Sequence, residues 1–130
     1  MRNLRFITTL AAIALAAPAL GCTFYARDAD TYKADTRTVL EEKNAQIKEC
    51  YDVALTTNEE VKGETIVNFT VEKKTGKFIN MEINPKSTAP EELSNCILSA
   101  IEGLQLDPVD QRDGVASFTW KFKVGKPNPA

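Results

Sequence analysis

The segment "VASFTWKFKV" alternates between apolar and polar residues more strictly than any other part of the chain. A period of two places successive side chains on opposite faces of a strand, so we expect a half-buried β-strand here. Aromatic residues on one face could form a binding platform, but at this regular spacing they are more typical of a packed core. The expected core face carries Ala116, Phe118, Trp120, Phe122 and Val124.

Two segments earlier in the chain predict a β-hairpin. "ETIVNFTVE" alternates, and its expected core face carries Thr65, Val67, Phe69 and Val71. The Gly-containing "KKTGK" has the length of a hairpin connection, and "FINMEIN" after it groups Ile79, Met81 and Ile83 on one face. We therefore expect two antiparallel strands.

Two further segments have the period of amphipathic helices. The first runs from about residue 36 to Asn58, and the second begins after the capping-box spacing of Thr88 and Glu91 and stops near Gly103. The order helix, strand, strand, helix, strand predicts an α+β fold, in which two helices pack on one face of a three-stranded antiparallel sheet.

Residues 1–21 have the composition of a signal peptide. Two arginines precede an apolar centre that is too short to span a bilayer comfortably, and small residues follow it. "ALGC" resembles a bacterial lipobox, with Leu20 one place later than usual, so we favour lipid attachment at Cys22. Ordinary cleavage would leave a soluble protein with a spare thiol, and a retained anchor is the third alternative. We expect lipid attachment and a short tether over 22–35, one domain over 36–124 and a tail over 125–130.

The number of cysteines supports lipid attachment. The chain has three cysteines, and in an oxidising compartment an odd number leaves one thiol over. Lipid on Cys22 leaves Cys50 and Cys96 as a pair. Both lie on the apolar stripes of predicted helices, so they could instead be two small buried hydrophobic residues. Export favours the disulfide, which would stabilise the fold by about 4 kcal/mol in the chain-entropy model.

Composition argues against several classes of function. Residues 1–21 contain two arginines and no acidic residue, so their removal changes the formal net charge from −2 to −4. Nucleic-acid binding requires clustered positive charge, so this acidic protein is a poor candidate for it. The chain has no histidine, which removes the commonest general base and a usual zinc ligand. The remaining carboxylates have structural explanations in a helix first turn and a loop, namely Glu91, Glu92, Asp107, Asp110 and Asp113. We expect no catalytic residue, no metal and no cofactor.

Binding would then depend on surfaces outside the core. The sheet face opposite the helices is the candidate interaction surface, and unpaired strand edges could accept a strand from a partner. The residues expected on this face are Ile66, Asn68, Thr70, Phe78, Asn80, Glu82, Thr119 and Lys121.

The chain resembles the AgmX/PglI C-terminal domain family, a cysteine-bearing relative of the TonB C-terminal domain. The similarity covers about residues 36–124 and rests on "ECYDVAL", Gly63 before "VNFTV", Gly76, Ser87-Thr88, "SNCILSAI" and "SFTWKF". The chain departs from the family in lacking the "W.FP.P" segment after the second helix and a proline in the last strand. The resemblance implies a TonB-like fold and a non-catalytic, protein-binding role linked to gliding or envelope-transport machinery. It carries over no active-site residues.

These observations predict a lipid-anchored protein of the cell envelope, on the periplasmic side of the outer membrane, that serves as an interaction or assembly module. The expected tether extends at most about 45 Å, too short for a transducer that spans the periplasm. The alternative is a soluble periplasmic protein that binds a small ligand or inhibits an enzyme. An enzyme that uses carboxylates alone is the third hypothesis.

Overall fold

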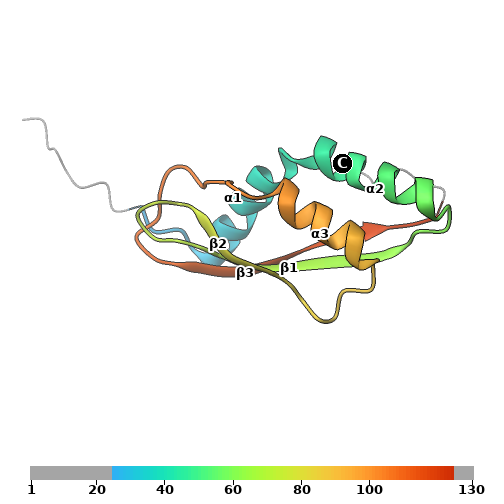
Figure 1. Cartoon of the computed structure of the whole chain (residues 1–130). Coiled ribbons are helices and arrows are strands. Elements are labelled where there is room, and N and C mark those ends of the chain that lie inside the picture. Colours follow the sequence, from blue (N-terminus) through green and yellow to red (C-terminus); the bar gives the residue numbers. More distant parts are fainter. Residues whose placement is uncertain (1–24, 125–130) are drawn as a thin grey trace, which may run out of the picture.

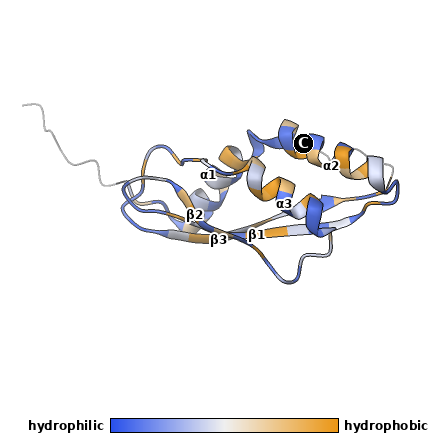
Figure 2. Cartoon of the chain, viewed as in Figure 1, coloured by the Kyte–Doolittle hydropathy of each residue, from blue (hydrophilic) through white to orange (hydrophobic). Residues whose placement is uncertain are grey.

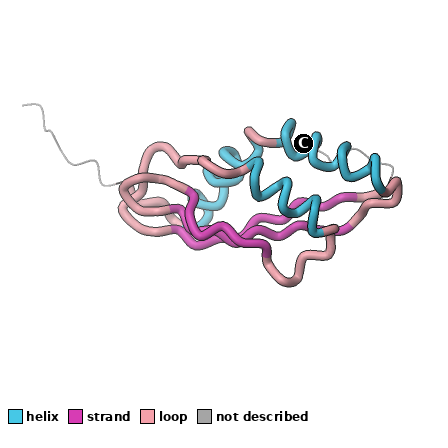
Figure 3. Tube along the Cα trace, in the orientation of Figure 1, coloured by secondary structure: helices cyan, strands magenta, loops and turns pink. Residues whose placement is uncertain are grey.

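The computed structural model describes residues 25–124, which form an α+β fold as predicted. Three antiparallel strands form a sheet in the order β2-β1-β3, and the helices lie on one of its faces (Figure 1, Figure 3). Along the chain the elements are α1 (Ala29–Glu41), α2 (Asn44–Thr57), β1 (Gly63–Val71), β2 (Phe78–Ile83), α3 (Glu91–Ala100) and β3 (Gly114–Phe122). Within the described residues, no helix has both the length and the apolar composition needed to cross a membrane.

The two strictly alternating strands pair along their whole length. β1 and β3 form nine consecutive antiparallel pairs, from Gly63 opposite Phe122 to Val71 opposite Gly114. Directly opposed residues share a face, so the uninterrupted alternation of both strands directs one common face toward the helices. The predicted core face of β1 is confirmed, because its odd-numbered residues from 65 to 71 are all buried. Val124 lies beyond the end of β3 and is 47% exposed, so its assignment to the core is wrong.

The second strand contains a β-bulge. Val71 pairs with Phe78 and Asn68 pairs with Glu82, so β2 spans one residue more than β1 between these two pairs. Asn80 lies within this interval and has a positive φ of 52°. A bulge of one residue reverses which side chains face the core on either side of it.

This bulge corrects two sequence-based assignments. Phe78, predicted on the face opposite the helices, is instead buried and stacks on Phe69 with 5.0 Å between ring centroids. Ile79, predicted in the core, is only half-buried and pairs with Thr70 of the outer face. Alternation within a strand of six residues could not reveal the extra residue.

The first helix begins earlier than predicted. Asp28 is its N-cap, and the Asp28 carboxylate accepts a hydrogen bond from the Thr31 backbone N–H at 2.8 Å. Residues 29–35 are therefore helical, and their assignment to a tether is wrong. The sequence did not predict this turn because α1 fully buries only Thr36 and Leu40, which is too few residues to define an apolar stripe.

The single helix predicted from residue 36 to Asn58 is two helices. The backbone N–H groups of Glu42 and Lys43 bond to carbonyls three residues earlier, and α2 begins after this tighter turn. The protein thus has three described helices rather than two. The end of α2 is confirmed, with Asn58 as its C-cap.

The predicted disulfide joins α2 to α3. Cys50 and Cys96 are bonded, with 5.7 Å between their Cα atoms. Cys50 is buried, whereas Cys96 is exposed and not on the buried stripe of α3. Ile47, Cys50 and Tyr51 form the buried face of α2, and the Tyr51 ring stacks on Phe122 of β3 at 5.2 Å.

The loop before α3 closes one sheet edge. Thr88 does not cap α3, because its Oγ1 accepts a hydrogen bond from the Glu64 backbone N–H at 2.9 Å. The Ser87 hydroxyl likewise accepts a hydrogen bond from the Ile66 N–H, while the Ala89 N–H donates to the Glu64 carbonyl. These bonds occupy the edge of β1 beyond the end of β2.

The core lies between the helices and the sheet. Hydrophobic segments occur on the helices and strands, while the loop after β2 is hydrophilic (Figure 2). The largest fully buried side chains include Leu40, Ile47, Leu93, Ile97 and Ile101. Thr65 is also fully buried, and its hydroxyl is hydrogen bonded to that of Ser94 at 2.9 Å.

Candidate functional site

The outer face of the sheet, which is the predicted interaction surface, is only partly open. Thr119, Lys121, Asn80 and Glu82 are exposed, while β1 contributes three half-buried residues. These three are Ile66, Asn68 and Thr70. A hollow at the edge of β3 includes only Thr119 and Lys121 of the predicted set.

Of the strands in the described residues, β3 has the longest edge that no other described strand covers, on the side that faces away from β1. Within residues 25–124, its backbone groups bond to no chain segment other than β1. The edge of β2 is shorter, contains the bulge, and is bonded at its start, where the Phe78 N–H donates to the Leu104 carbonyl. A long unpaired edge is a template for another strand.

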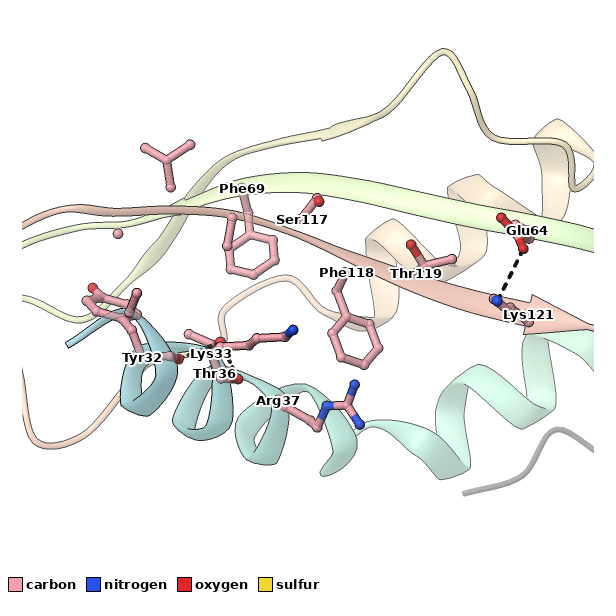
Figure 4. Close-up of a pocket in the computed structure, with 14 residues that line it drawn as sticks. Tyr32, Lys33, Thr36, Arg37, Glu64, Phe69, Ser117, Phe118, Thr119 and Lys121 are labelled. Atoms are coloured by element: carbon pink, nitrogen blue, oxygen red, sulfur yellow. Dashed lines mark hydrogen bonds and ion pairs between the residues drawn. The ribbon is translucent and has the colours of Figure 1, made fainter. Parts of the chain in front are cut away.

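This open edge borders a groove of about 750 Å³, which we call the β3 groove. Its walls are α1 from Ala29 to Arg37 and β3 from Gly114 to Lys121, with Glu64 and Phe69 of β1. Figure 4 shows the rings of Phe69 and Phe118 pointing from the sheet toward α1.

One end of the β3 groove depends on a glycine. A Cβ atom at Gly114 would overlap the outer end of the Tyr32 ring, so glycine lets this ring pack against the start of β3. The Tyr32 hydroxyl donates a hydrogen bond to the Arg112 carbonyl at 3.4 Å. The Thr36 hydroxyl is satisfied within the helix by the Tyr32 carbonyl at 2.8 Å.

Cations predominate along the β3 groove. Its lining includes Lys33, Arg37 and Lys121 but a single acid, Glu64. The Arg37 guanidinium lies 5.6 Å from the centre of the Phe118 ring, and Lys121 Nζ is 3.7 Å from a Glu64 carboxylate oxygen (Figure 4). Glu64 offsets one of these three positive charges, so two remain. The groove is therefore basic, although the domain as a whole is acidic.

A second hollow lies across the start of β1 and the end of β3. It has a volume of about 650 Å³, shares Glu64 and Lys121 with the β3 groove, and extends to Lys62, Thr88 and Lys123. This hollow therefore extends from β3 across β1 to the loop before α3, rather than along the open edge of β3.

The candidate carboxylates do not assemble a catalytic or metal-binding centre. In the described part of the chain no three residues among His, Cys, Asp and Glu are grouped so that they could hold a metal ion. Glu91 and Glu92 are exposed in the first turn of α3, and Asp113 accepts a hydrogen bond from the Lys73 N–H. Asp107 is exposed.

Of the five candidate carboxylates, Asp110 is the one that is buried, with 1% of its surface exposed. Burial by itself would raise the pKa of Asp110, but hydrogen bonds from the backbone N–H groups of Arg27 and Arg112, together with their positive charges, hold that pKa below its ordinary value. Asp110 is thus a charged structural partner of Arg27 at neutral pH and is unsuited to proton transfer there.

The interaction surface predicted from the sequence contains two residues of the β3 groove, Thr119 and Lys121. It contains none of the residues that α1 contributes. Lys33 and Arg37 lay in the segment taken as a tether and its border, and Phe118 was assigned wholly to the core although it is half-buried. The spacing of Asp28 and Thr31 was an available N-cap signal for the missed turn. Cys22, the predicted lipid-attachment site, lies outside the described residues.

No family model, curated protein or solved structure matches this chain. The resemblance to the AgmX/PglI domains therefore stays a prediction from the sequence motifs.

Proposed function

We propose that this chain is a lipid-anchored protein of the bacterial envelope, without catalytic activity, whose domain binds an extended segment of a partner protein by strand addition to β3. The observation that carries this proposal is the open nine-residue edge of β3 beside the β3 groove. Strand addition uses the unpaired backbone groups of a sheet edge for affinity and adjacent hollows for side-chain selectivity.

The groove favours one kind of partner segment. An added strand presents alternate side chains to opposite faces, so every second residue would point toward Phe118 and α1. Lys33 and Arg37 at that wall favour acidic residues, and the Phe118 ring offers an apolar contact. We therefore infer an extended segment that combines acidic and apolar residues.

The length of the site supports a peptide over a compact ligand. The β3 groove extends beside β3 from Gly114 to Lys121, which suits a strand of several residues. The volume of the β3 groove alone also falls within the range of about 300 to 1,000 Å³ common for small-molecule sites, so a small-ligand binder is the second candidate.

Peptide selection with charge-reversed variants tests the proposal. A library of random twelve-residue peptides is selected against the full-length protein, and the affinities of the recovered peptides are measured by calorimetry. We expect acid-rich peptides whose affinity falls at least about tenfold with Arg37→Glu, since each lost charge contact contributes on the order of 1 kcal/mol or more. Lys48→Glu on the exposed face of α2 is the matched control, because Lys48 pairs with Asp52 and does not line the β3 groove. Recovered peptides that are insensitive to Arg37→Glu would contradict the proposed site.

The membrane part of the proposal rests on the lipobox-like "ALGC" and has its own test. Mass spectrometry of the purified protein should show a chain that begins at Cys22 and carries acyl groups. A mature chain without lipid would favour the soluble small-ligand binder.

A further inference from the structure

Arg27 is a buried cation held by partners far away in the sequence. Its side chain is fully buried, and Nη1 lies 3.5 Å from an Asp110 carboxylate oxygen while Nε donates to Asp35 at 2.6 Å. Nη2 donates to the Pro108 carbonyl at 2.8 Å, and the Tyr25 ring lies 4.5 Å from the guanidinium carbon. A buried arginine with this many partners is fixed in position, because any displacement would leave a charge unpaired.

The backbone around Arg27 is fixed in the same way. The Arg27 N–H donates to the Asp110 carboxylate at 2.8 Å, and the Arg112 guanidinium donates to the Arg27 carbonyl at 2.7 Å. The Tyr25 carbonyl accepts a hydrogen bond from the Gln111 N–H at 3.0 Å. We call this set of contacts the Arg27 clamp. It attaches the chain to the loop 107–113 from Tyr25 onward.

The clamp leaves little chain between the domain and the proposed lipid. Three residue steps separate Cys22 from Tyr25, which span at most about 11 Å even when fully extended. The tether expected from the sequence, over 22–35, would have allowed about 45 Å. An anchor this short cannot hold the domain away from a bilayer.

We propose that the Arg27 clamp holds the domain directly against the lipid bilayer, with the end of the sheet nearest Tyr25 as the contact surface. This inference rests on the proposed acylation of Cys22. The occupant of this surface is the phospholipid headgroup layer of the leaflet that holds the acyl chains.

The contact surface consists of three segments that hydrogen bonds bring together. The turn between β1 and β2 joins the loop 107–113, because the Lys74 N–H donates to the Asp110 carbonyl at 2.9 Å, and that loop holds Tyr25. α1 and this turn lie at the same end of the molecule in Figure 1. The turn exposes Lys73 and Lys74, and two apolar side chains are exposed nearby, Tyr25 at 40% and Val115 at 84%. Lysine and tyrosine side chains are suited to the interface between water and lipid.

Charge is a secondary factor in this contact. The carboxylates of Glu72, Asp107 and Asp113 are interleaved with the exposed lysines, so this end has no strong net charge. The short anchor determines the orientation, and the exposed lysine, tyrosine and valine side chains suit the headgroup region. The β3 groove then begins beside the bilayer, since Ala29 and Gly114 line its nearer end.

Energy transfer from two ends of the domain to the membrane tests the inference. A donor dye is placed through a non-canonical amino acid at position 73 in the near turn or at position 60 in the loop before β1. β1 separates these two positions by about 27 Å. The acylated full-length protein is reconstituted in phosphatidylethanolamine and phosphatidylglycerol vesicles that contain an acceptor-labelled lipid.

We expect the donor at position 73 to lose a clearly larger share of its emission than the donor at position 60. A matched variant carries twelve inserted Gly and Ser residues between Thr23 and Phe24, which add a flexible span of about 20 Å and leave the clamp intact. The difference between the two donors should shrink in this variant.

The outcomes separate the inference from the proposed function. Equal quenching at both positions in a protein that carries the acyl mass would overturn the docked orientation and leave the lipid anchor standing. An unchanged difference after the insertion would also overturn it, because the short anchor would then not be its cause. A protein without acyl groups would overturn both.

Discussion

Replacing Arg27 with methionine tests the physical basis of the clamp. Methionine fills much of the space of the arginine stem but carries no charge, so the Asp110 carboxylate, which is 1% exposed, would lose its guanidinium partner inside the protein. Breaking a buried ion pair on one side typically costs about 3 to 5 kcal/mol, because the remaining charge is desolvated without compensation. Asp35 would suffer less, since its side chain is 38% exposed and can be hydrated.

The double variant Arg27→Met, Asp110→Asn separates the unpaired charge from lost packing. It leaves no buried charge, and exchanging a buried ion pair for neutral groups is often close to neutral in stability. We therefore expect the double variant to recover part of the loss caused by Arg27→Met alone. Recovery is incomplete because an asparagine has one oxygen for the two backbone N–H groups that bond to separate Asp110 oxygens. The assay is urea denaturation at pH 7, with every chain carrying Cys22→Ser so that all of them lack lipid.

The pH dependence gives a second readout. The pKa of Asp110 is lowered in the folded state, so its charged form stabilises the fold at neutral pH, and this contribution is lost as the pH falls below about 4. Asp110→Asn should therefore flatten the acid limb of the stability profile. An Arg27→Met protein within about 1 kcal/mol of the parent, or a double variant whose loss equals the sum of the single losses, would refute this reasoning.

Four further predictions follow from the fold and the proposed site. Changing Cys50 and Cys96 to serine should cost up to about 4 kcal/mol in urea denaturation, from the loop of 46 residues that the disulfide closes. Phe78→Ala should cost about 3 to 5 kcal/mol and Ile79→Ala clearly less; the reverse order would contradict the bulge. Cys22→Ser should move the protein from the membrane to the soluble fraction of fractionated cells, and unchanged membrane retention would rule out the lipid anchor. Gly114→Ala should destabilise the fold by about 1 to 3 kcal/mol through the Tyr32 ring, and a stability unchanged within error would show that α1 is not held there.

The parts of the fold that the sequence predicted are those with an uninterrupted period. β1 and β3 alternate over nine residues each, and the core face of β1 and the buried Trp120 and Phe122 of β3 were predicted correctly. β2 alternates too, but one extra residue near Asn80 reverses which of its side chains face the core. The pattern of six residues does not distinguish a bulged strand from a regular one. The disulfide was predicted from cysteine number and compartment, without any knowledge of distance.

The candidate site was harder to predict because it depends on contacts between distant segments. The first turns of α1 follow from the Asp28 cap but bury few apolar residues, so helical periodicity did not reveal them. The burial of Arg27 depends on Asp110, 83 residues further along the chain, and no local pattern indicates such a partner. The outer face of the sheet was predicted as the interaction surface, whereas the larger hollow lies at the strand edge, which only the order β2-β1-β3 identifies.

The most direct measurement of strand addition is residue-resolved amide hydrogen exchange of the full-length protein with and without a selected acidic peptide. An added strand would bond to the backbone groups of β3 that face away from β1, so exchange should slow at alternate residues between Gly114 and Phe122, while β2 should be unchanged. Slowed exchange confined to β2 or to the loop after it, with β3 unaffected, would contradict binding at the β3 edge.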